Sequence, residues 1–359
     1  MSDIDIVKQG AAAIVTLNRP KALHALTDDM RRELAVAMPD FSRDPMIYGM
    51  VIRSEGSRAF CAGGDVRQLV ALGRQDIALA RASFADEYRL NWRLECFSKP
   101  TVSLINGAVM GSGVGLTVYG THRVAGEGYQ FAMPETAIGL FPDVGVCHHL
   151  ARMPHEIGTY LGLTGTSIGR ADAFALGLVT HCIPAVQFQA ITEAVSDADP
   201  VDDLLDPLHE EPGETSVMTY GPDIAEWFAG PSIMDIAARL EAAAQLSTET
   251  GAFAAKTLSR LRECAPLSLA VTLRHLRAAR HYDQRDMLMA DYGLACAFLD
   301  GSDFYEGVRA ALIDKDRSPS WQPAGLESVT DHMVARYFAP GTHDTLELAT
   351  RTEMQAARA

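Results

Sequence analysis

Hydrophobic residues in the first part of the chain occur in two alternating patterns. Short continuous runs bounded by Gly, Pro or polar residues, such as residues 11–17 (AAAIVTL), are typical of buried strands. Apolar positions that recur every three or four residues behind a capping residue, as after Thr27, predict helices. The pattern predicts strands at 11–17, 48–53, 101–105, 122–125 and 129–132, and helices at 28–38, from 66 onward, at 75–97 and at 113–120. Repeated strand–helix units of this kind predict an α/β fold with a mainly parallel sheet.

The second half of the chain has a different pattern. Residues 196–216 are acidic and rich in Pro, which predicts a surface excursion or a boundary. The tail after Pro323 is expected to form an amphipathic helix followed by a flexible end. Helical periodicity with many Ala and Leu residues covers 232–280 and 283–312, after helical pieces within 146–180. We therefore expect a core over residues 1–200 and a mainly helical region over residues 201–359.

Composition and charge narrow the class of protein by exclusion. The formal net charge of −15 and the lack of a basic stripe argue against a nucleic-acid partner, so any phosphate site must be local. The six cysteines are scattered without a C-x-x-C pair, which is typical of reduced thiols. The first ten residues resemble neither a signal nor a transit peptide, and no apolar run of about 18 residues predicts a membrane span. We therefore expect a soluble cytoplasmic protein.

Candidate chemistry concentrates around two small-residue turns that each precede a helix. One is Gly111-Ser112-Gly113, at the start of the stretch 106–145, and the other is Ala62-Gly63-Gly64-Asp65. Such turns let a ligand approach the backbone, and a helix start presents unpaired N–H groups. Two of them could aim one N–H each at a single oxygen, an arrangement worth about 3–4 kcal/mol per donor in the transition state. The alternative is that both are structural turns, with Asp65 as an N-cap.

Two acids follow the second turn, Glu135 and Asp143. They are separated by apolar residues and flanked by prolines. In such surroundings the pKa of a carboxyl group rises, and each acid raises the pKa of the other if they are close. One could act as base or nucleophile and the other as acid. The alternative is a surface loop in which both acids are solvated.

Other reactive residue types do not complete a site. His148-His149 and His155-Glu156 lack the spacing of zinc ligands, so no metal is expected. Cys61 has no histidine nearby in the sequence and is expected to be a small packed residue. Ser112 lies in G-S-G-V-G, which does not match the nucleophile motif G-x-S-x-G.

Three longer motifs make the chain resemble a known family. RAFCAGGDV (58–66), NGAVMGSGVGL (106–116) and FAMPETAIGLFPDVG (131–145) resemble the crotonase (enoyl-CoA hydratase/isomerase) superfamily and, within it, the 3-hydroxyisobutyryl-CoA hydrolases. The resemblance continues through DEYRLNW (86–92), CAPLSLAVTLRHL (264–276) and DFYEGVRAALIDKDRSPSWQP (303–323). It therefore covers nearly the whole chain.

The resemblance implies a fold and a class of substrate. The fold is a spiral of ββα turns, with the C-terminal helices packing over the active site. The substrate is an acyl-CoA thioester, with CoA arriving as part of it and no other cofactor. Trimers or hexamers are common among such proteins. The thioester carbonyl is expected to bind the amides of Ala62 and Ser112, within turns that also contribute Gly63, Gly64, Asp65 and Gly111, and Lys21–His24 are expected to contact CoA through the backbone.

The acids select a reaction within the superfamily. Hydratases of this kind have a glutamate where this chain has Gly115, whereas Glu135 is kept and Asp143 stands where hydratases have glycine. This is the hydrolase pattern. Glu87 resembles a third acid that holds the acyl hydroxyl or a water, and Ser112 replaces a glycine usual in the hydrolases, which narrows the pocket.

We therefore expect hydrolysis of a short branched 3-hydroxyacyl-CoA, such as 3-hydroxyisobutyryl-CoA in valine degradation. Glu135 is expected either to attack the carbonyl or to activate water. Asp143 is expected to bind the 3-hydroxyl or to protonate the leaving group. Two alternatives stay open at this point: an enoyl-CoA hydratase or isomerase on the same scaffold, and a non-catalytic acyl-CoA-binding protein.

Overall fold

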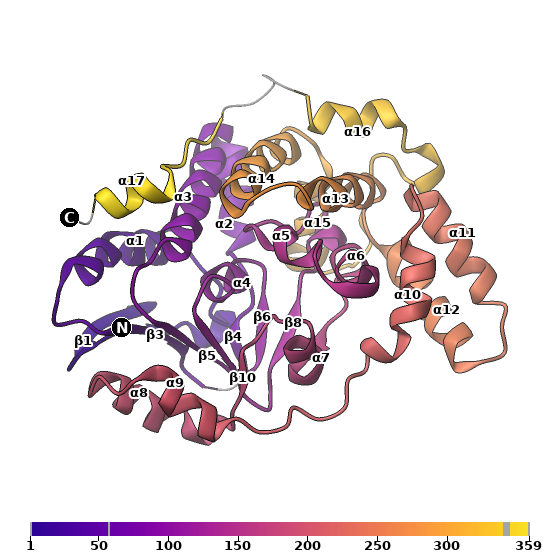
Figure 1. Cartoon of the computed structure of the whole chain (residues 1–359). Coiled ribbons are helices and arrows are strands. Elements are labelled where there is room, and N and C mark those ends of the chain that lie inside the picture. The colour runs from indigo at the N-terminus through magenta and orange to yellow at the C-terminus, as the bar shows by residue number, and fades with distance from the viewer. Residues whose placement is uncertain (1, 57, 340–344, 358–359) are drawn as a thin grey trace.

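The computed structural model describes residues 2–56, 58–339 and 345–357. Two sheets form its centre (Figure 1). The first has the order β1-β2-β3-β5-β7-β10 and the second the order β4-β6-β8-β9. The strands are β1 (Ile4–Gln9), β2 (Ala12–Leu17), β3 (Gly49–Ser54), β4 (Ala59–Cys61), β5 (Thr101–Ile105), β6 (Ala108–Met110), β7 (His122–Ala125), β8 (Gln130–Ala132), β9 (Ile168–Gly169) and β10 (His181–Cys182).

Successive strands alternate between the two sheets, which makes the chain a spiral. β3, β5 and β7 join the first sheet in parallel, and β4, β6 and β8 join the second in parallel. Helical segments follow β4, β6 and β8, so each turn of the spiral is a ββα unit. Because each unit repeats the last, the short loops before the helical segments lie at neighbouring positions of the spiral.

The helices and 3-10 turns include every helix expected in the first half of the chain. They are α1 (Asp28–Arg43), α2 (Val66–Gln75), α3 (Ile77–Glu95), α4 (Ser112–Thr117), η2 (Glu135–Ile138), α5 (Val146–Leu150), α6 (Ile157–Thr164), α7 (Arg170–Ala175), α8 (Phe188–Ser196), α9 (Val201–Leu205), α10 (Gly221–Phe228), α11 (Ile233–Ala243), α12 (Glu249–Glu263), α13 (Pro266–Ala279), α14 (Gln284–Leu299), α15 (Asp303–Val308), α16 (Asp331–Tyr337) and α17 (Arg351–Ala356). Thr27 caps α1 as predicted, accepting a hydrogen bond from the amide of Met30.

The first sheet is buried on both faces, and its residues divide between two hydrophobic clusters. Ala12 and Ile14 of β2 pack in one cluster with residues of α8 and α9. Ala13, Val15 and Leu17 pack in the other cluster, with α1 and most of the helices. This division follows from the alternation of side chains along a strand. The wholly apolar run predicted as a buried strand is therefore confirmed.

The strand pattern missed β1, which pairs antiparallel with β2 at the edge of the sheet. Only Ile4 of this strand is buried, and its last residues, Val7 to Gln9, are exposed. A strand that buries so few residues carries no clear hydrophobic signal, because its position depends on hydrogen bonds to its neighbour.

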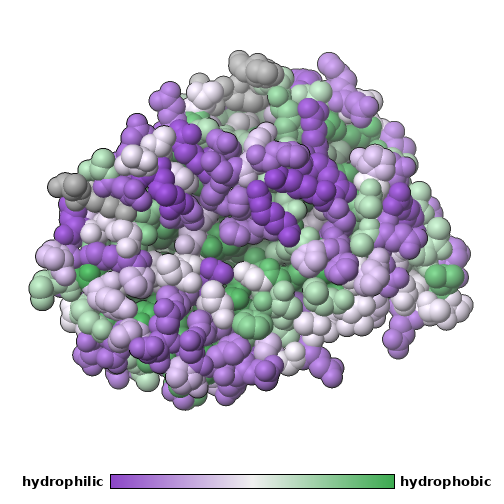
Figure 2. Space-filling view, viewed as in Figure 1, coloured by the Kyte–Doolittle hydropathy of each residue, from purple (hydrophilic) through white to green (hydrophobic). Residues whose placement is uncertain are grey.

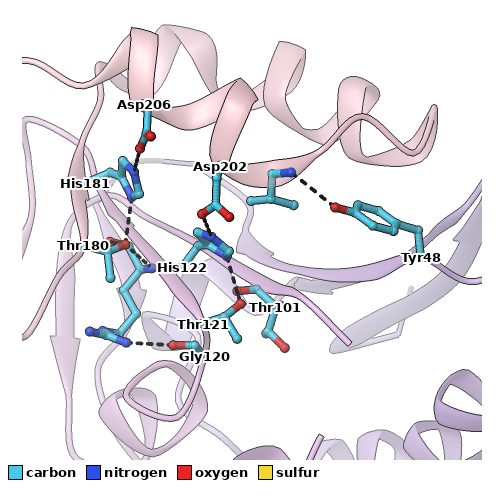
Figure 3. Close-up of polar contacts among 11 residues, drawn as sticks. Tyr48, Thr101, Gly120, Thr121, His122, Thr180, His181, Asp202 and Asp206 are labelled. Atoms are coloured by element: carbon cyan, nitrogen blue, oxygen red, sulfur yellow. Dashed lines mark hydrogen bonds and ion pairs between the residues drawn. The ribbon is translucent and has the colours of Figure 1, made fainter. Parts of the chain in front are cut away.

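The α9 part of the acidic segment 196–216 lies against the first sheet. His122 of β7 contacts Asp202 at 2.8 Å, and His181 of β10 contacts Asp206 at 3.1 Å, both through Nε2 (Figure 3). α9 also buries apolar residues in the cluster beneath the sheet. The prediction of a surface excursion is thus wrong for the α9 part of the segment, while the division into two regions at residue 200 stays a prediction.

The C-terminal helices pack beside and above the spiral (Figure 1). α14 lies against α3, and α13 lies against α5 and α6. The last described stretch is tied to α3, because the indole N–H of Trp92 donates to the carbonyl oxygen of Ala349 at 2.7 Å and Arg351 pairs with Glu95. The predicted flexible end falls partly on residues 340–344 and 358–359, which lie outside the described residues.

The surface in the orientation of Figure 1 is largely hydrophilic, with hydrophobic residues showing in smaller areas between polar ones (Figure 2). Among the helices that the structure describes, none combines the length and the hydropathy that crossing a membrane requires.

Candidate active site

A cleft of about 540 Å³ brings together residues from several separate parts of the chain. The loop between β4 and α2, the turn between β6 and α4, helix α3, and the segment around η2 all contribute to its wall. All nine residues singled out from the sequence line it: Ala62, Gly63, Gly64, Asp65, Glu87, Gly111, Ser112, Glu135 and Asp143. Residues spread over some eighty positions of the chain thus meet because their loops occupy equivalent places in successive turns.

The two glycine turns lie next to each other in the wall of the cleft. Gly111 has φ +46° and Gly63 has φ +114°, conformations that favour glycine. A Cβ atom on Gly111 would lie 3.0 Å from Oε1 of Glu135 and 3.5 Å from Cα of Gly63. Because the two turns and the acid approach this closely, a side chain at Gly111 would displace Glu135 or the facing loop.

The hydrogen bonds of the backbone amides in these turns contradict one prediction. The N–H of Ala62, expected to bind the substrate oxygen, already donates to the carbonyl oxygen of Leu23 at 3.0 Å, so the prediction for Ala62 is wrong. Among the described residues, no acceptor is bonded to the N–H of Gly64 or of Ser112. These two residues are adjacent, because a Cβ on Gly64 would lie 2.8 Å from Oγ of Ser112. Gly64 and Ser112 therefore provide the free pair of donors.

Glu135 begins the short turn η2 and is only 7% exposed. Its Oε2 atom is buried without a hydrogen-bond partner in the described part of the chain. Burial raises the pKa of Glu135 to about 8, as expected for a carboxyl group taken out of water. A buried carboxyl oxygen without a partner is costly to keep, and it is free to react.

Asp143 lies in the loop that follows η2 and is also buried. The hydroxyl of Tyr88 donates to its Oδ2 at 2.8 Å. Burial, followed by the nearby carboxylates of Glu87 and Glu135, raises the pKa of Asp143 well above its usual value. The prediction of raised pKa values is thus confirmed for both acids, and the alternative of a solvated loop is wrong.

The loop carrying Asp143 is fixed from behind. Gly145 donates its N–H to Oδ2 of Asp291 at 2.7 Å, and its carbonyl oxygen accepts from Gln284 at 3.1 Å. Both partners belong to α14. A helix of the C-terminal region therefore holds the loop that places an acid in the cleft, a contact between residues far apart in sequence.

Glu87 of α3 lines the cleft and forms an ion pair with Arg31 of α1 at 3.1 Å. Sequence reasoning missed both Arg31 and Tyr88, because a charged residue near the start of a helix and a tyrosine in a long helix are ordinary features. Asp65 behaves as the structural alternative foresaw, because its side chain caps α2 by accepting from the amide of Gln68 at 3.3 Å, and it also pairs with Arg19.

Position 115, where hydratases carry a glutamate, is closely packed by its neighbours. A Cβ atom there would lie 2.8 Å from Nδ2 of Asn91 and 3.0 Å from Cβ of Val144. The side-chain amide of Asn91 also donates to the carbonyl oxygen of Gly115 at 3.0 Å. A glutamate at position 115 would require both neighbours to move, so the packing matches glycine at this position.

The remaining candidates lie apart from any reactive arrangement. Cys61 is fully buried, and burial raises the pKa of its thiol to about 12. His148 donates a hydrogen bond from Nδ1 to the carbonyl oxygen of Tyr282 and does not line the cleft. Over residues 2–56, 58–339 and 345–357, no group of three or more His, Cys, Asp or Glu residues is arranged to hold a metal ion.

Three cationic residues line the cleft toward its mouth. Lys21 and Arg67 are exposed, and Arg19 is partly buried beside Asp65. In a chain with a net charge of −15, this local group of cations can attract an anion that the whole protein repels.

Free backbone donors facing buried acids define a class of enzyme, one that binds a carbonyl oxygen through the main chain and uses carboxyl groups in the reaction. The family model for enoyl-CoA hydratase/isomerase matches residues 12–338. The chain belongs to this family, and the ββα spiral is the crotonase fold expected from the sequence motifs.

Curated relatives resemble the chain over nearly its whole length. The mitochondrial 3-hydroxyisobutyryl-CoA hydrolase of Gallus gallus is 38% identical, covering 97% of this chain and 91% of the relative. The 3-hydroxyisobutyryl-CoA hydrolase 1 of Arabidopsis thaliana is 36% identical, covering 99% of this chain and 96% of the relative.

Two solved structures are also similar over most of their length. An enoyl-CoA hydratase from Rhodobacter sphaeroides is 40% identical with a TM-score of 0.90, covering 97% of this chain and 100% of that one. A carnitinyl-CoA dehydratase from Mycobacterium thermoresistibile is 35% identical with a TM-score of 0.89, covering 95% of this chain and 98% of that one.

Proposed function

We propose that this enzyme hydrolyses short-chain acyl-CoA thioesters, with 3-hydroxyisobutyryl-CoA as its main substrate, giving 3-hydroxyisobutyrate and CoA in valine degradation. The observation that carries the proposal is the set of acids in the cleft: Glu135 and Asp143 are present and buried, and position 115 has no room for an acid. Curated relatives with this activity cover nearly the whole chain.

The chemistry begins at the thioester carbonyl. Its oxygen accepts hydrogen bonds from the amides of Gly64 and Ser112, which stabilise the negative charge that develops there. Glu135 then acts in one of two ways. As a base it takes a proton from water while the water oxygen bonds to the acyl carbon. As a nucleophile its own oxygen forms that bond, giving an anhydride that water cleaves afterwards.

In both routes the bond between the acyl carbon and sulfur breaks, and the sulfur leaves with the electron pair. Asp143 is the proton donor for that sulfur, because burial raises its pKa and so favours the protonated form. Tyr88 holds Asp143 in place by its hydrogen bond. One proton of the water consumed replaces the proton that Asp143 gave to sulfur, and the other leaves with the product, so the net products are the free acid and the CoA thiol.

The phosphates of CoA are proposed to lie at the mouth of the cleft, near Lys21 and Arg67. These two side chains are exposed and line the cleft, so they can reach an anion without breaking a buried ion pair. The backbone from Lys21 to Leu23 lines the same side of the cleft. CoA arrives within the substrate, and the proposed reaction needs no metal or redox cofactor.

The test is a panel of acyl-CoA esters assayed for release of free thiol. We expect 3-hydroxyisobutyryl-CoA to be cleaved with the highest kcat/KM and crotonyl-CoA not to be hydrated. The hydratase alternative is kept because the similar solved structures include an enoyl-CoA hydratase and a carnitinyl-CoA dehydratase. Hydration of crotonyl-CoA without thiol release from any ester would overturn the hydrolase proposal, and binding without either reaction would favour a non-catalytic acyl-CoA-binding protein.

The pH dependence of kcat/KM follows from the two buried acids. Glu135 must be ionised to act, and its pKa is raised to about 8, so kcat/KM is expected to rise between pH 6 and pH 8. Asp143 must stay protonated, so the rate falls again only at higher pH. A pH–rate profile of thiol release measures both limbs. A profile that is flat from pH 5 upward would contradict the assignment of Glu135.

Localisation in the cytoplasm and assembly into trimers or hexamers remain proposals. The first rests on the six scattered cysteines without a C-x-x-C pair, which are typical of a reducing compartment, and the second on the family resemblance.

A further inference from the structure

Arg31 of α1 is a buried cation in the wall of the cleft, and the proposed reaction does not use it. Its side chain is 8% exposed, although α1 otherwise turns charged residues such as Arg32 to the solvent. Burying a guanidinium group is costly unless charged partners surround it. A cation kept at this place therefore requires an explanation.

Three partners fix the guanidinium group. Nη2 donates to Oγ of Ser83 at 2.9 Å and also contacts Asp28, and Ser83 in turn donates to Asp28 at 2.7 Å. Nη1 donates to Oε2 of Glu87 at 3.1 Å. Burial lowers the pKa of Arg31, but the carboxylates of Glu87 and Asp28 outweigh it, so that the pKa is raised overall.

The same contacts orient Glu87. Its Oε2 atom is occupied by Arg31, whereas Oε1 has no hydrogen bond from any residue that the structure describes. A carboxylate oxygen accepts two hydrogen bonds, so Oε1 is available to a donor in the cleft. Arg31 also lies next to the free amides, because a Cβ on Gly64 would be 3.6 Å from its Nη1. The pair thus forms a polar corner beside the site of the thioester carbonyl.

We propose that Arg31 determines acyl specificity by positioning Glu87, so that Glu87 accepts a hydrogen bond from a hydroxyl group on the acyl chain. Arg31 is a positioning residue in this scheme, since its own donors are directed at Glu87, Asp28 and Ser83. The inference rests on the proposed function for its substrate class and goes beyond it by assigning to Arg31 the orientation of Glu87, and through it the preference for a hydroxylated acyl group.

The charges of the corner favour a hydroxyl over a carboxylate. One cation faces two carboxylates, Glu87 and Asp28, so the corner carries net negative charge. A second carboxylate on the acyl group would be repelled, and a plain alkyl group would leave Oε1 of Glu87 unpaired. A neutral hydroxyl group can donate a hydrogen bond to Oε1 of Glu87 without adding charge.

The experiment measures binding rather than turnover, and hydrolysis is suppressed in every variant by Glu135→Gln. All variants carry Glu135→Gln, and titration calorimetry gives Kd for 3-hydroxyisobutyryl-CoA and for isobutyryl-CoA, which lacks only the hydroxyl. In the Glu135→Gln parent we expect the hydroxylated ester to bind about tenfold more tightly, the effect of a hydrogen bond to a charged group. Adding Arg31→Met should reduce this ratio about fivefold and change the Kd of isobutyryl-CoA less than about twofold.

A double-mutant cycle tests whether Arg31 acts through Glu87. Glu87→Gln should lower the ratio by itself, and Arg31→Met added to it should lower the ratio no further, because residues that act as one unit are not additive. The matched control is Arg32→Met, the exposed neighbour that pairs with Asp29 on the same helix, and it should leave the ratio unchanged. If Arg31→Met does not fold, Arg31→Lys can be used instead. It keeps the positive charge but lacks the paired N–H donors of the guanidinium group, and it should lower the ratio about twofold.

An unchanged ratio in Arg31→Met or Arg31→Lys, an equal weakening of both esters, or additive effects in the cycle would each overturn the inference. Failure of the proposed function gives a different result, which is the absence of thiol release by the unmodified enzyme from either ester. The ratio of dissociation constants would still report on Arg31 in that case.

Discussion

Replacing Glu135 by Gln is expected to lower kcat for thiol release by about a thousandfold, with little change in KM. Glutamine has the same shape but can neither accept the proton of water nor attack the acyl carbon. Because burial already keeps the Glu135 carboxyl group largely protonated near neutral pH, the neutral amide fits the site without loss of folding stability. Steady-state rates together with the melting temperature measure the two effects separately.

Glu33→Gln is the matched control, since Glu33 is an exposed residue of α1 away from the cleft. It should change neither kcat nor the melting temperature. A Glu135→Gln enzyme that keeps more than about a tenth of the wild-type rate would rule out a direct chemical role for this residue.

A single turnover in water labelled with ¹⁸O separates the two roles of Glu135. If Glu135 is a nucleophile and water attacks the carbonyl carbon that belongs to the enzyme, the label enters the Glu135 carboxylate. If Glu135 is a base, or if water attacks the acyl carbon of the anhydride, the label appears only in the product acid, so label in the enzyme is the result that proves attack by Glu135. Mass spectrometry of the peptide containing Glu135 reads the result directly.

Asp143→Asn is expected to lower kcat by about a hundredfold, the effect of removing a general acid, and to remove the high-pH limb of the profile. Asparagine can keep the hydrogen bond from Tyr88, so the loop should stay in place. The variant therefore removes the proton that Asp143 donates without changing the geometry of the loop. The measurement is the pH–rate profile of thiol release for both enzymes.

Tyr88→Phe provides the comparison for that variant. It removes the hydroxyl that contacts Asp143 but leaves the acid itself, so the high-pH limb should remain and shift upward, because this hydrogen bond lowers the pKa of Asp143. If Asp143→Asn keeps the full rate and an unchanged high-pH limb, Asp143 does not donate the proton.

The nine site residues were predictable because each lies within a local motif. The turns ending at Gly64 and Ser112 could be recognised from small residues ahead of a helix, and the acids from their apolar neighbours. The structure places them all in one cleft. The motifs could not show which backbone N–H groups already have a hydrogen-bond acceptor. Ala62 and Gly64 lie in the same turn, and only the contact between Ala62 and Leu23 decides which amide remains free.

The residues that were missed share a different property. Arg31 and Tyr88 lie in regular helices and have no motif of their own in this single sequence. Their importance depends on which side chains they meet, Glu87 in one case and Asp143 in the other. The edge strand β1 was missed for a related reason, since pairing with β2 and not burial determines its conformation.

The amino-acid sequence by itself determined the α/β class, most helix and strand positions, the family, and the acids and turns of the cleft. These features depend on local periodicity and on short motifs, which are properties of neighbouring residues. Tertiary structure alone decided which amides are free, how far the pKa values of Glu135 and Asp143 rise, and that Arg31 is paired with Glu87. Those features depend on burial and on contacts between distant segments, and they exist only once the spiral has closed around the cleft.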